Sequence, residues 1–303
     1  MASLGWQVIR ALFGAGERLA PGIAGRAAFE LFARTPNPRA QTEGERKAVS
    51  RAADFMRTAR HHRLTVGQDC VAVHEFRPDA GAGDAGRVLV VHGWRSRTEY
   101  MKTIVEGFRA AGFRVFAIDL QGHGQSAGRQ LTVMKAVDAL ATAAQWFGPF
   151  DAVVGHSFGG AVAVAAVAGT VKTTAPLAAG RLVLIAAPNS LLDIVDGFAR
   201  QIGLGSRSRE AMVARIEHLA ERRLQDFSGA RQLARLRVPT FVVHAPDDRK
   251  VPADDARAYG EAGGHVTLHW APGLGHRRIL SDADVVSRIV SFARMPAQLA
   301  RAS

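Results

Sequence analysis

Apolar residues recur with a helical period over residues 1–60. Pro21 favours the start of a second helix there, and the stretch 35–38, which contains two prolines, favours its end. Thr42 and Glu45 have the spacing of a capping box, which predicts a third helix running to about Arg60. The residues that define one face of the first helix are Leu4, Val8, Ile9, Leu12 and Phe13.

From residue 63 the pattern changes to short apolar runs that are typical of strands. Helical patterns such as Thr98–Ala111 and Leu131–Phe147 lie between these runs. Strands that alternate with helices predict an α/β fold with a mostly parallel central sheet flanked by helices. The predicted strands are Leu64–Val66, Cys70–Phe76, Arg87–His92, Phe113–Leu120, Ala152–Gly155, Arg181–Ala187, Thr240–His244 and Val266–Trp270.

One connection in this pattern is much longer than the others. Residues 189–238 separate two predicted strands, although a crossover needs only about a dozen residues. We interpret the surplus as a short helical cap over the carboxyl edge of the sheet. The predicted division is an N-terminal helical extension (1–62), a core (63–188 and 239–303) and the cap (189–238). Apolar residues early in the cap either line an acyl pocket or only seat the cap on the core: Leu191, Leu192, Ile194, Val195 and Phe198.

A serine lies between a predicted buried strand and a predicted helix of small residues. The sequence there is Gly155-His156-Ser157-Phe158-Gly159, which has the Gly-x-Ser-x-Gly pattern of a nucleophile elbow. Such a turn is so tight that side chains two residues before and after the serine would collide. The pattern predicts that Ser157 is a nucleophile.

A serine hydroxyl needs a base, and the base in turn needs an acid that orients it. Of the late histidines, His265 precedes its strand and His269 lies within it, whereas His276 follows the strand in a loop at the carboxyl edge. We therefore expect His276 to be the base. Asp247 and Asp248 both follow the preceding strand, and the pattern alone does not choose between them.

An acyl-transfer site also needs two N–H donors for the oxyanion. One is expected from Phe158, the residue after the nucleophile. The other is expected from Trp94, because Gly93 follows a buried strand and permits close approach of the backbone.

Together these motifs resemble the α/β-hydrolase superfamily over about residues 64–296, and most of all its lysophospholipase, monoacylglycerol-lipase and serine-aminopeptidase branch. The resemblance implies a Ser157–Asp248–His276 triad, with Asp247 facing outward to cap the turn or meet Arg249. It also implies that Asp119 and the Gly122–Gly124 turn shape the floor of the site. The motifs that carry it are His92-Gly93-Trp94, residues 119–126, the elbow at Ser157, residues 248–252 and Gly275-His276.

Composition and charge exclude several classes of protein. The 303-residue chain is 48% hydrophobic and 22% charged, which is globular composition. Its single cysteine, Cys70, excludes internal disulfides and a cysteine-based zinc site, and the eleven histidines are scattered. We expect neither metal nor cofactor. The net charge of +12 comes from basic residues dispersed among acids, with no aromatic-interleaved stripe, so no nucleic-acid partner is expected.

Two interpretations stay open for residues 1–40. Their apolar faces pack on the main domain, or they lie on an anionic membrane with Trp6 and Arg10 as anchors. Arg10 interrupts the first apolar stretch, which argues against a secretory signal, and no run reaches the about 18–20 apolar residues of a membrane span. The expected location is cytoplasmic, with peripheral contact at the inner membrane face as the alternative.

The predicted function is that of a serine hydrolase acting on a carboxylic ester, with a medium-sized hydrophobic ester or a lysolipid as substrate. The same three residues could serve an amidase or aminopeptidase, or an acyltransferase in which an alcohol replaces water. A non-catalytic ligand-binding homologue is the alternative outside enzymes. The sequence does not indicate the oligomeric state.

Overall fold

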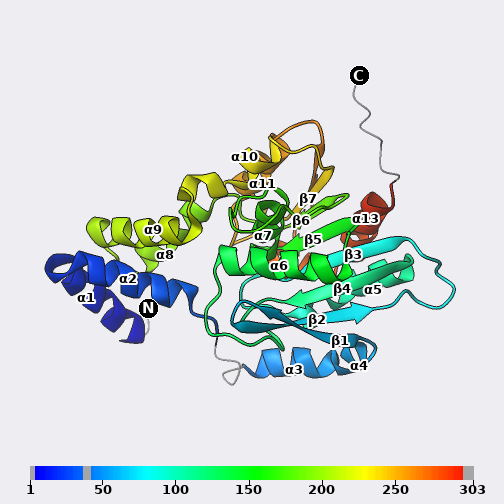
Figure 1. The fold of residues 1–303 in the computed structure, drawn as a ribbon, viewed down its shortest axis with the longest axis horizontal. Coiled ribbons are helices and arrows are strands. Elements are labelled where there is room, and N and C mark those ends of the chain that lie inside the picture. Colours follow the sequence, from blue (N-terminus) through cyan, green and yellow to red (C-terminus); the bar gives the residue numbers. More distant parts are fainter. Residues whose placement is uncertain (1–3, 37–41, 296–303) are drawn as a thin grey trace.

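The computed structural model describes residues 4–36 and 42–295, and shows a central sheet with helices on both faces and a helical lobe at one end (Figure 1). Asn37 and Pro38 of the predicted helix break lie outside the described residues, as do residues 1–3 of the predicted extension and 296–303 of the predicted core.

Eight strands form one sheet, in the order β1-β2-β4-β3-β5-β6-β7-β8. Strands β1 and β2 pair antiparallel, as do β2 and β4, and every other neighbouring pair is parallel. The predicted α/β class with a mostly parallel sheet is confirmed. The strands are β1 (Arg60–Val66), β2 (Asp69–Phe76), β3 (Gly86–Val91), β4 (Phe113–Asp119), β5 (Ala152–His156), β6 (Leu182–Ile185), β7 (Thr240–His244) and β8 (Val266–Trp270).

Helices cover both faces of the sheet because its inner strands are apolar on both sides. In β3, Val88 and Val90 face one apolar core, and Leu89 and Val91 face the other. The first core is closed mainly by α4 (Ala53–Arg57), α5 (Lys102–Ala110) and α13 (Ala283–Arg294), and the second by α6 (Val133–Phe147), α7 (Phe158–Val167) and α11 (Ala253–Gly260).

The third predicted helix ends earlier than expected. The Thr42–Glu45 capping box is present, but α3 (Glu43–Arg51) ends at Arg51. The next helix, α4, ends at Arg57, and β1 begins at Arg60. The first residues of β1 are polar because it is an edge strand, so the apolar pattern did not reveal them. Its His62 side chain instead contacts Glu75 of β2, with 2.7 Å between Nε2 and Oε2.

The first two helices pack on the cap rather than on the sheet. Helices α1 (Leu4–Leu19) and α2 (Pro21–Ala33) lie beside α8 (Leu191–Ile202) and α9 (Ser206–Ala220) to form the lobe in Figure 1. A Cβ atom on Gly25 would lie 2.6 Å from Ser208 O, so α2 and α9 are nearly in backbone contact. The remaining short helices are η1 (Thr98–Met101), η2 (Leu224–Phe227), α10 (Gly229–Leu233) and α12 (Gly275–Arg278).

The first helix does not bury the whole apolar face that its sequence suggests. Ile9 and Phe13 pack against the core of the lobe, whereas Val8 and Leu12 are 51% and 66% exposed. Across residues 4–36 and 42–295, no helix has the length and apolar character needed to cross a membrane. The same residues hold no cluster of side chains suited to a metal ion.

Candidate active site

Ser157 sits at the sharp turn between β5 and α7. Its backbone has φ 53° and ψ −125°, a left-handed conformation that a non-glycine residue adopts only when its surroundings impose it. A Cβ atom on Gly155 would lie 2.5 Å from Gly159 O, and one on Gly159 would lie 2.5 Å from His92 O. Both glycines are therefore required by close backbone contacts around the serine.

A chain of hydrogen bonds joins the three residues singled out in the sequence. His276 Nε2 lies 3.1 Å from Ser157 Oγ, and His276 Nδ1 lies 2.7 Å from Asp248 Oδ2. In the arrangement that satisfies both contacts, Nδ1–H donates to the carboxylate and Nε2 accepts from the serine hydroxyl. His276 lies on α12, one turn of helix, rather than in the loop that was expected.

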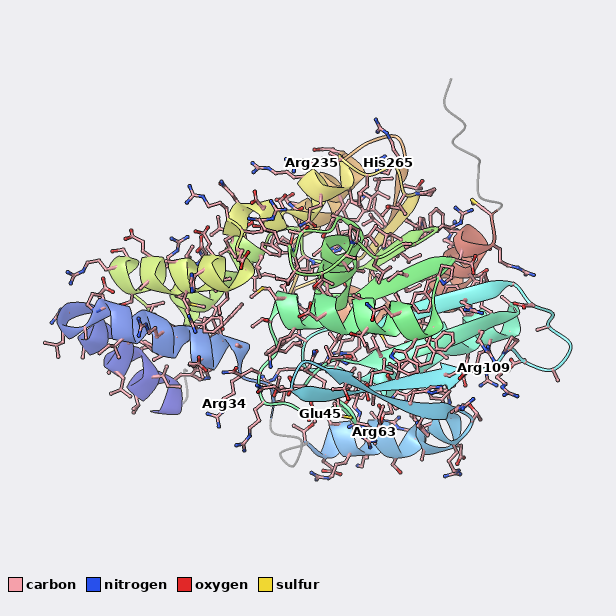
Figure 2. All side chains as sticks on the ribbon, in the orientation of Figure 1. Arg34, Glu45, Arg63, Arg109, Arg235 and His265 are labelled. Carbon is pink, nitrogen blue, oxygen red and sulfur yellow. The ribbon has the colours of Figure 1, made fainter. Side chains whose placement is uncertain are left out.

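The other two late histidines lie elsewhere. His265 Nε2 is 3.1 Å from Leu233 O, and Figure 2 shows His265 near Arg235 at the outer edge of the molecule. His269 lies within β8 and stacks on Phe241, with 6.1 Å between the ring centroids. Neither contacts Ser157.

Asp248 is fixed on the opposite side of His276 by its own turn. Its Oδ1 accepts hydrogen bonds from the backbone N–H groups of Lys250, at 2.7 Å, and Val251, at 3.2 Å. Burial alone would raise the pKa of Asp248, but these donors and His276 together lower it below its ordinary value. The side chain is thus held as a carboxylate that faces the imidazole.

The neighbouring Asp247 does not meet Arg249. Its Oδ1 accepts a hydrogen bond from Gly273 N–H at 2.7 Å, which ties the turn after β7 to the loop after β8. Since that loop leads into His276, Asp247 braces the histidine's segment without touching its ring. No local pattern in the sequence indicated this long-range contact.

The loop after β3 passes directly beside the nucleophile. A Cβ atom on Gly93 would lie 2.9 Å from the Ser157 Cβ, which explains the glycine there. The Trp94 ring lies edge-on to Phe158, at 5.9 Å, and to His123, at 5.3 Å between centroids. Residues 94 and 158, the two predicted oxyanion donors, therefore lie on segments that flank Ser157.

His156, the buried residue before the nucleophile, contacts the backbone of His276. Its Nε2–H donates to the backbone carbonyl of His276 at 2.9 Å, and the two rings lie 4.9 Å apart. Burial and the nearby His276 lower the pKa of His156 to about 3. A neutral imidazole thus anchors the backbone of the helix that carries His276.

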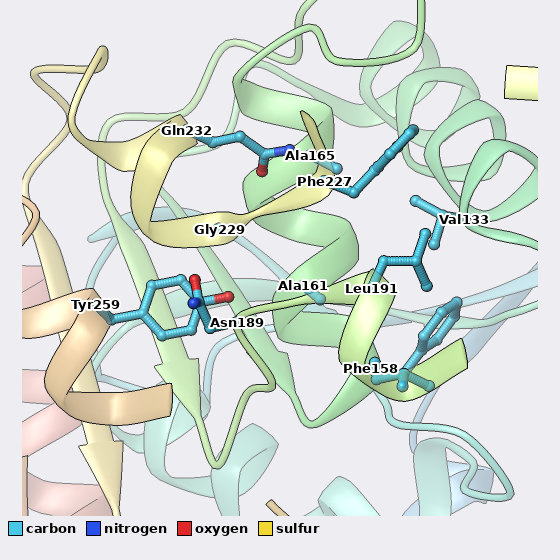
Figure 3. Close-up of a pocket in the computed structure, with 11 residues that line it drawn as sticks. Val133, Phe158, Ala161, Ala165, Asn189, Leu191, Phe227, Gly229, Gln232 and Tyr259 are labelled. Carbon is cyan, nitrogen blue, oxygen red and sulfur yellow. The ribbon is translucent and has the colours of Figure 1, made fainter. Parts of the chain in front are cut away.

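A small, mostly apolar cavity begins at Phe158 and runs along α7 under the cap. In Figure 3, Phe158 and Leu191 lie together at one end, and Asn189 and Tyr259 lie at the other. Of the five cap residues named above, Leu191 and Ile194 line this cavity, whereas Val195 is fully buried in the core beside it. The polar groups at the far end have internal partners, because Asn189 Oδ1 accepts from Ala230 N–H and Tyr259 Oη–H donates to Pro188 O, each at 2.8 Å.

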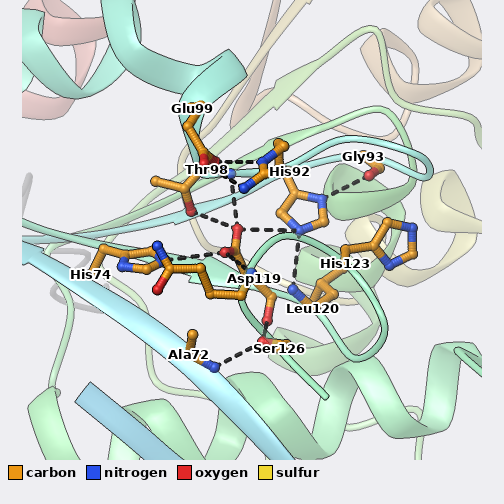
Figure 4. A network of polar contacts seen from close by, with 12 residues as sticks. Ala72, His74, His92, Gly93, Thr98, Glu99, Asp119, Leu120, His123 and Ser126 are labelled. Atoms are coloured by element: carbon orange, nitrogen blue, oxygen red, sulfur yellow. Dashed lines mark hydrogen bonds and ion pairs between the residues drawn. The ribbon is translucent and has the colours of Figure 1, made fainter. Parts of the chain in front are cut away.

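The predicted floor of the site is a buried polar network centred on Asp119 (Figure 4). Thr98 donates to Oδ1 through both its N–H and its hydroxyl, each at 2.9 Å, and Gln125 N–H donates to Oδ2 at 2.8 Å. His74 Nε2–H donates to Oδ2 at 3.1 Å. Although burial opposes ionisation, these donors and the two nearby histidines, His74 and His92, lower the pKa of Asp119, so it is a carboxylate.

The sequence did not predict the two histidines of this network as part of the site floor, because His74 was not singled out and His92 was named only within the His92-Gly93-Trp94 motif. His74 lies buried within β2 and His92 directly after β3, so a histidine in or beside an apolar run was the available signal. His92 Nε2 accepts from Leu120 N–H at 3.0 Å, and its Nδ1–H donates to Gly93 O at 2.7 Å. Through Gly93, the network fixes the loop that lies against Ser157.

Comparisons with known proteins agree with this architecture. A non-heme chloroperoxidase from Burkholderia pyrrocinia is 24% identical over 264 residues, with 71% of this chain and 94% of that protein covered. An esterase structure from Pyrococcus furiosus has a TM-score of 0.58 at 20% identity, covering 80% of this chain and 93% of its own. A bromoperoxidase structure from Bacillus anthracis has a TM-score of 0.56 at 16% identity, covering 77% and 99%. The model of the alpha/beta hydrolase family matches residues 88–289, and the chain belongs to that family.

Proposed function

We propose that this protein is a serine hydrolase that cleaves a carboxylic ester through an acyl-enzyme on Ser157. The observation that carries the proposal is the continuous chain of hydrogen bonds from Ser157 Oγ through His276 to Asp248. A serine at its ordinary pKa is a poor nucleophile, and this arrangement supplies a base of fixed tautomer next to it.

The reaction follows from these positions. Ser157 Oγ attacks the ester carbonyl while His276 Nε2 takes the hydroxyl proton, and the N–H groups of Trp94 and Phe158 stabilise the oxyanion. His276 then gives its proton to the departing alkoxide, which leaves as the alcohol. In the second half, His276 takes a proton from water, whose oxygen attacks the acyl-enzyme, and Ser157 recovers its proton as the acid leaves.

The cavity beside Phe158 supports an apolar acyl group. Its walls are mainly apolar side chains of α7 and the cap, and its polar groups already have partners within the protein. A charged or strongly polar acyl group would lose its hydration there without gaining new hydrogen bonds. We therefore assign the acyl part of the ester to this cavity, with a monoacylglycerol or lysolipid as the leading class of substrate.

Activity-based labelling tests the proposal directly. A fluorophosphonate probe should modify Ser157 in the wild-type protein, with the site mapped by mass spectrometry, and Ser157→Ala should abolish both labelling and ester hydrolysis. Removal of the nucleophile should reduce turnover by about 10⁴-fold or more, without a change in melting temperature. Undiminished labelling of the Ser157→Ala protein would refute the assignment.

A substrate panel separates ester hydrolysis from the other reactions open to the same site. Esters of increasing acyl length, matched amides and an acceptor alcohol should be compared, with esters expected to be turned over fastest. Because the Burkholderia relative is named a chloroperoxidase, peroxide-dependent halide oxidation belongs in the same panel. A clear preference for amides would replace the ester proposal with an amidase.

A further inference from the structure

We propose that the outer face of α1 docks the protein on an anionic lipid surface. This outer face consists of Val8, Leu12 and Leu19 of α1, together with Ile23 of α2. Their exposed fractions are 51%, 66%, 86% and 72%. Since successive helical residues are about 100° apart, the three α1 residues fall within about 40° of one another, in a single stripe.

The residues of the outer face are not the ones that pack α1 against the rest of the lobe. A neighbouring side of α1, about 100° around the helix from the stripe, packs against the core of the lobe through Ile9 and Phe13. The one acidic residue of α1 also turns inward, where the Glu17 carboxylate accepts hydrogen bonds from the Ser208 backbone N–H at 2.9 Å and from its hydroxyl at 2.5 Å. The helix therefore presents its apolar stripe outward while its acid is used internally.

The charge beside the stripe selects an anionic surface over a neutral one. Arg18, which precedes Leu19 in α1, and Arg26, three residues after Ile23 in α2, are both exposed, and within residues 4–36 and 42–295 neither has an acidic partner. The whole chain also carries a net charge of +12, which favours an anionic surface. An apolar stripe with unpaired arginines at its edge fits a bilayer that contains anionic lipid, where the stripe enters the acyl boundary and the arginines meet the headgroups.

The anchoring positions differ from those expected from the sequence. Arg10 lies against α8, because a Cβ atom on Gly203 at the end of α8 would lie 3.3 Å from Arg10 Nε. Trp6 is only 37% exposed and lies about 140° around the helix from Leu19. Leu12, Leu19 and Arg18 therefore replace Trp6 and Arg10 as the residues that contact lipid.

Docking through α1 would place the proposed ester site close to its substrate. The same lobe contains α8, whose residues Leu191 and Ile194 line the cavity beside Phe158. This part of the inference rests on the proposed function, since it makes membrane lipid the source of the ester. The lipid contact itself depends only on the outer face and its arginines.

Vesicle sedimentation tests the contact. The full-length protein should pellet with vesicles of phosphatidylcholine and phosphatidylglycerol at low salt, and much less with phosphatidylcholine alone. Leu12→Asp should lower the binding constant about tenfold, because a charge replaces a buried leucine in the interface. Trp146→Asp is the matched control, since Trp146 is 70% exposed on α6, outside the lobe, and its replacement should leave binding unchanged.

The charge requirement has its own pair of variants. Arg18→Glu/Arg26→Glu should weaken binding to the anionic vesicles and remove its salt dependence. Arg231→Glu/Arg235→Glu makes the same change in net charge at the distant edge where Figure 2 labels Arg235, and should affect binding much less. Equal losses in both double variants would mean that net charge alone is responsible, and would overturn the assignment to α1.

Further outcomes separate this inference from its rivals. If wild-type protein does not pellet with anionic vesicles, the inference is wrong. If sedimentation equilibrium shows a dimer that Leu12→Asp dissociates, the outer face is an interface between two copies instead. Ser157→Ala should still bind vesicles, and Leu12→Asp should still hydrolyse a soluble short-chain ester at the wild-type rate. Vesicle binding without any ester hydrolysis would refute the proposed function and leave the lipid contact standing.

Discussion

The carboxyl edge of the sheet and the helical lobe are held together by different means. At the edge, polar side chains are buried and each is fixed by several hydrogen bonds, as for Asp119 and Asp248. In the lobe, apolar contacts between helices dominate, and a large part of the apolar surface faces outward. The difference suggests that the edge holds side chains in fixed orientations, whereas the lobe offers apolar surface for contact with a partner.

Substitutions should separate the two regions. At the edge, removing a single hydrogen-bonding group should damage turnover more than stability, because the fold there is set by the strands while the chemistry depends on orientation. In the lobe, removing a contact should lower stability or binding and leave the reaction with a soluble substrate unchanged.

The largest effect should come from Asp248→Asn. The amide would favour the wrong tautomer of His276, a change that cost about 10⁴-fold in turnover in the serine-protease precedent. Asp247→Asn is the matched control, because its amide oxygen can still accept from Gly273 N–H, and it should cost no more than about tenfold. Steady-state kinetics with a soluble ester measures both. The reverse ranking would assign the acid to Asp247.

A smaller effect is expected at His156, which we describe as a positioning residue because it acts through the backbone of His276. His156→Phe removes the donor to the carbonyl and should lower kcat about fivefold with KM unchanged, since one hydrogen bond is worth about 1 kcal/mol. His156→Gln keeps an N–H donor and should recover part of the loss. If the Phe and Gln variants have equal kcat, the hydrogen bond has no positioning role.

His156 should also make the fold sensitive to acid. Its pKa is about 3 in the folded protein and about 6.5 when unfolded, so the unfolded chain binds a proton first as pH falls. The contribution of His156 to the free energy of unfolding is therefore fully present above about pH 6.5 and is lost as the pH falls towards 3. Thermal melts across that range should show a shallower pH dependence for His156→Phe than for wild type. An unchanged slope would mean that His156 does not contribute.

The smallest effect is expected in the lobe, at Glu17. Its carboxylate accepts from the N–H groups of Arg207 and Ser208, at 3.1 and 2.9 Å, and so caps the start of α9, where no residue of the helix itself does so. Glu17→Ala should lower the melting temperature by a few degrees without changing turnover of a soluble ester. Glu210→Ala, at an exposed position of α9, should change neither. A loss of turnover in Glu17→Ala would link the lobe to the chemistry.

The local parts of the molecule were predictable because their signals are local. The apolar runs gave the inner strands, the capping box gave the start of α3, and the spacing Gly155-x-Ser157-x-Gly159 gave the elbow. The order of serine, acid and histidine identified Ser157 and His276 but left Asp247 and Asp248 open. The family resemblance chose Asp248, and the structure brings these three residues within hydrogen-bonding distance. Their catalytic roles follow as proposals from that geometry.

Other features depended on partners far away in the chain. The polar residues at the start of β1 form a strand because they pair with β2. Asp247 accepts its hydrogen bond from Gly273, which lies twenty-six residues later in the chain. Only part of the apolar face of the first helix is buried, because α8 and α9 cover only one side of it and leave Leu12 exposed. Periodicity and turn chemistry act over a few residues, so most elements, the mostly parallel sheet and the candidate nucleophile could be predicted from the chain alone. Which side chains are covered, and what each polar group bonds, could be seen only in the folded protein, because both depend on segments that lie far apart in the sequence.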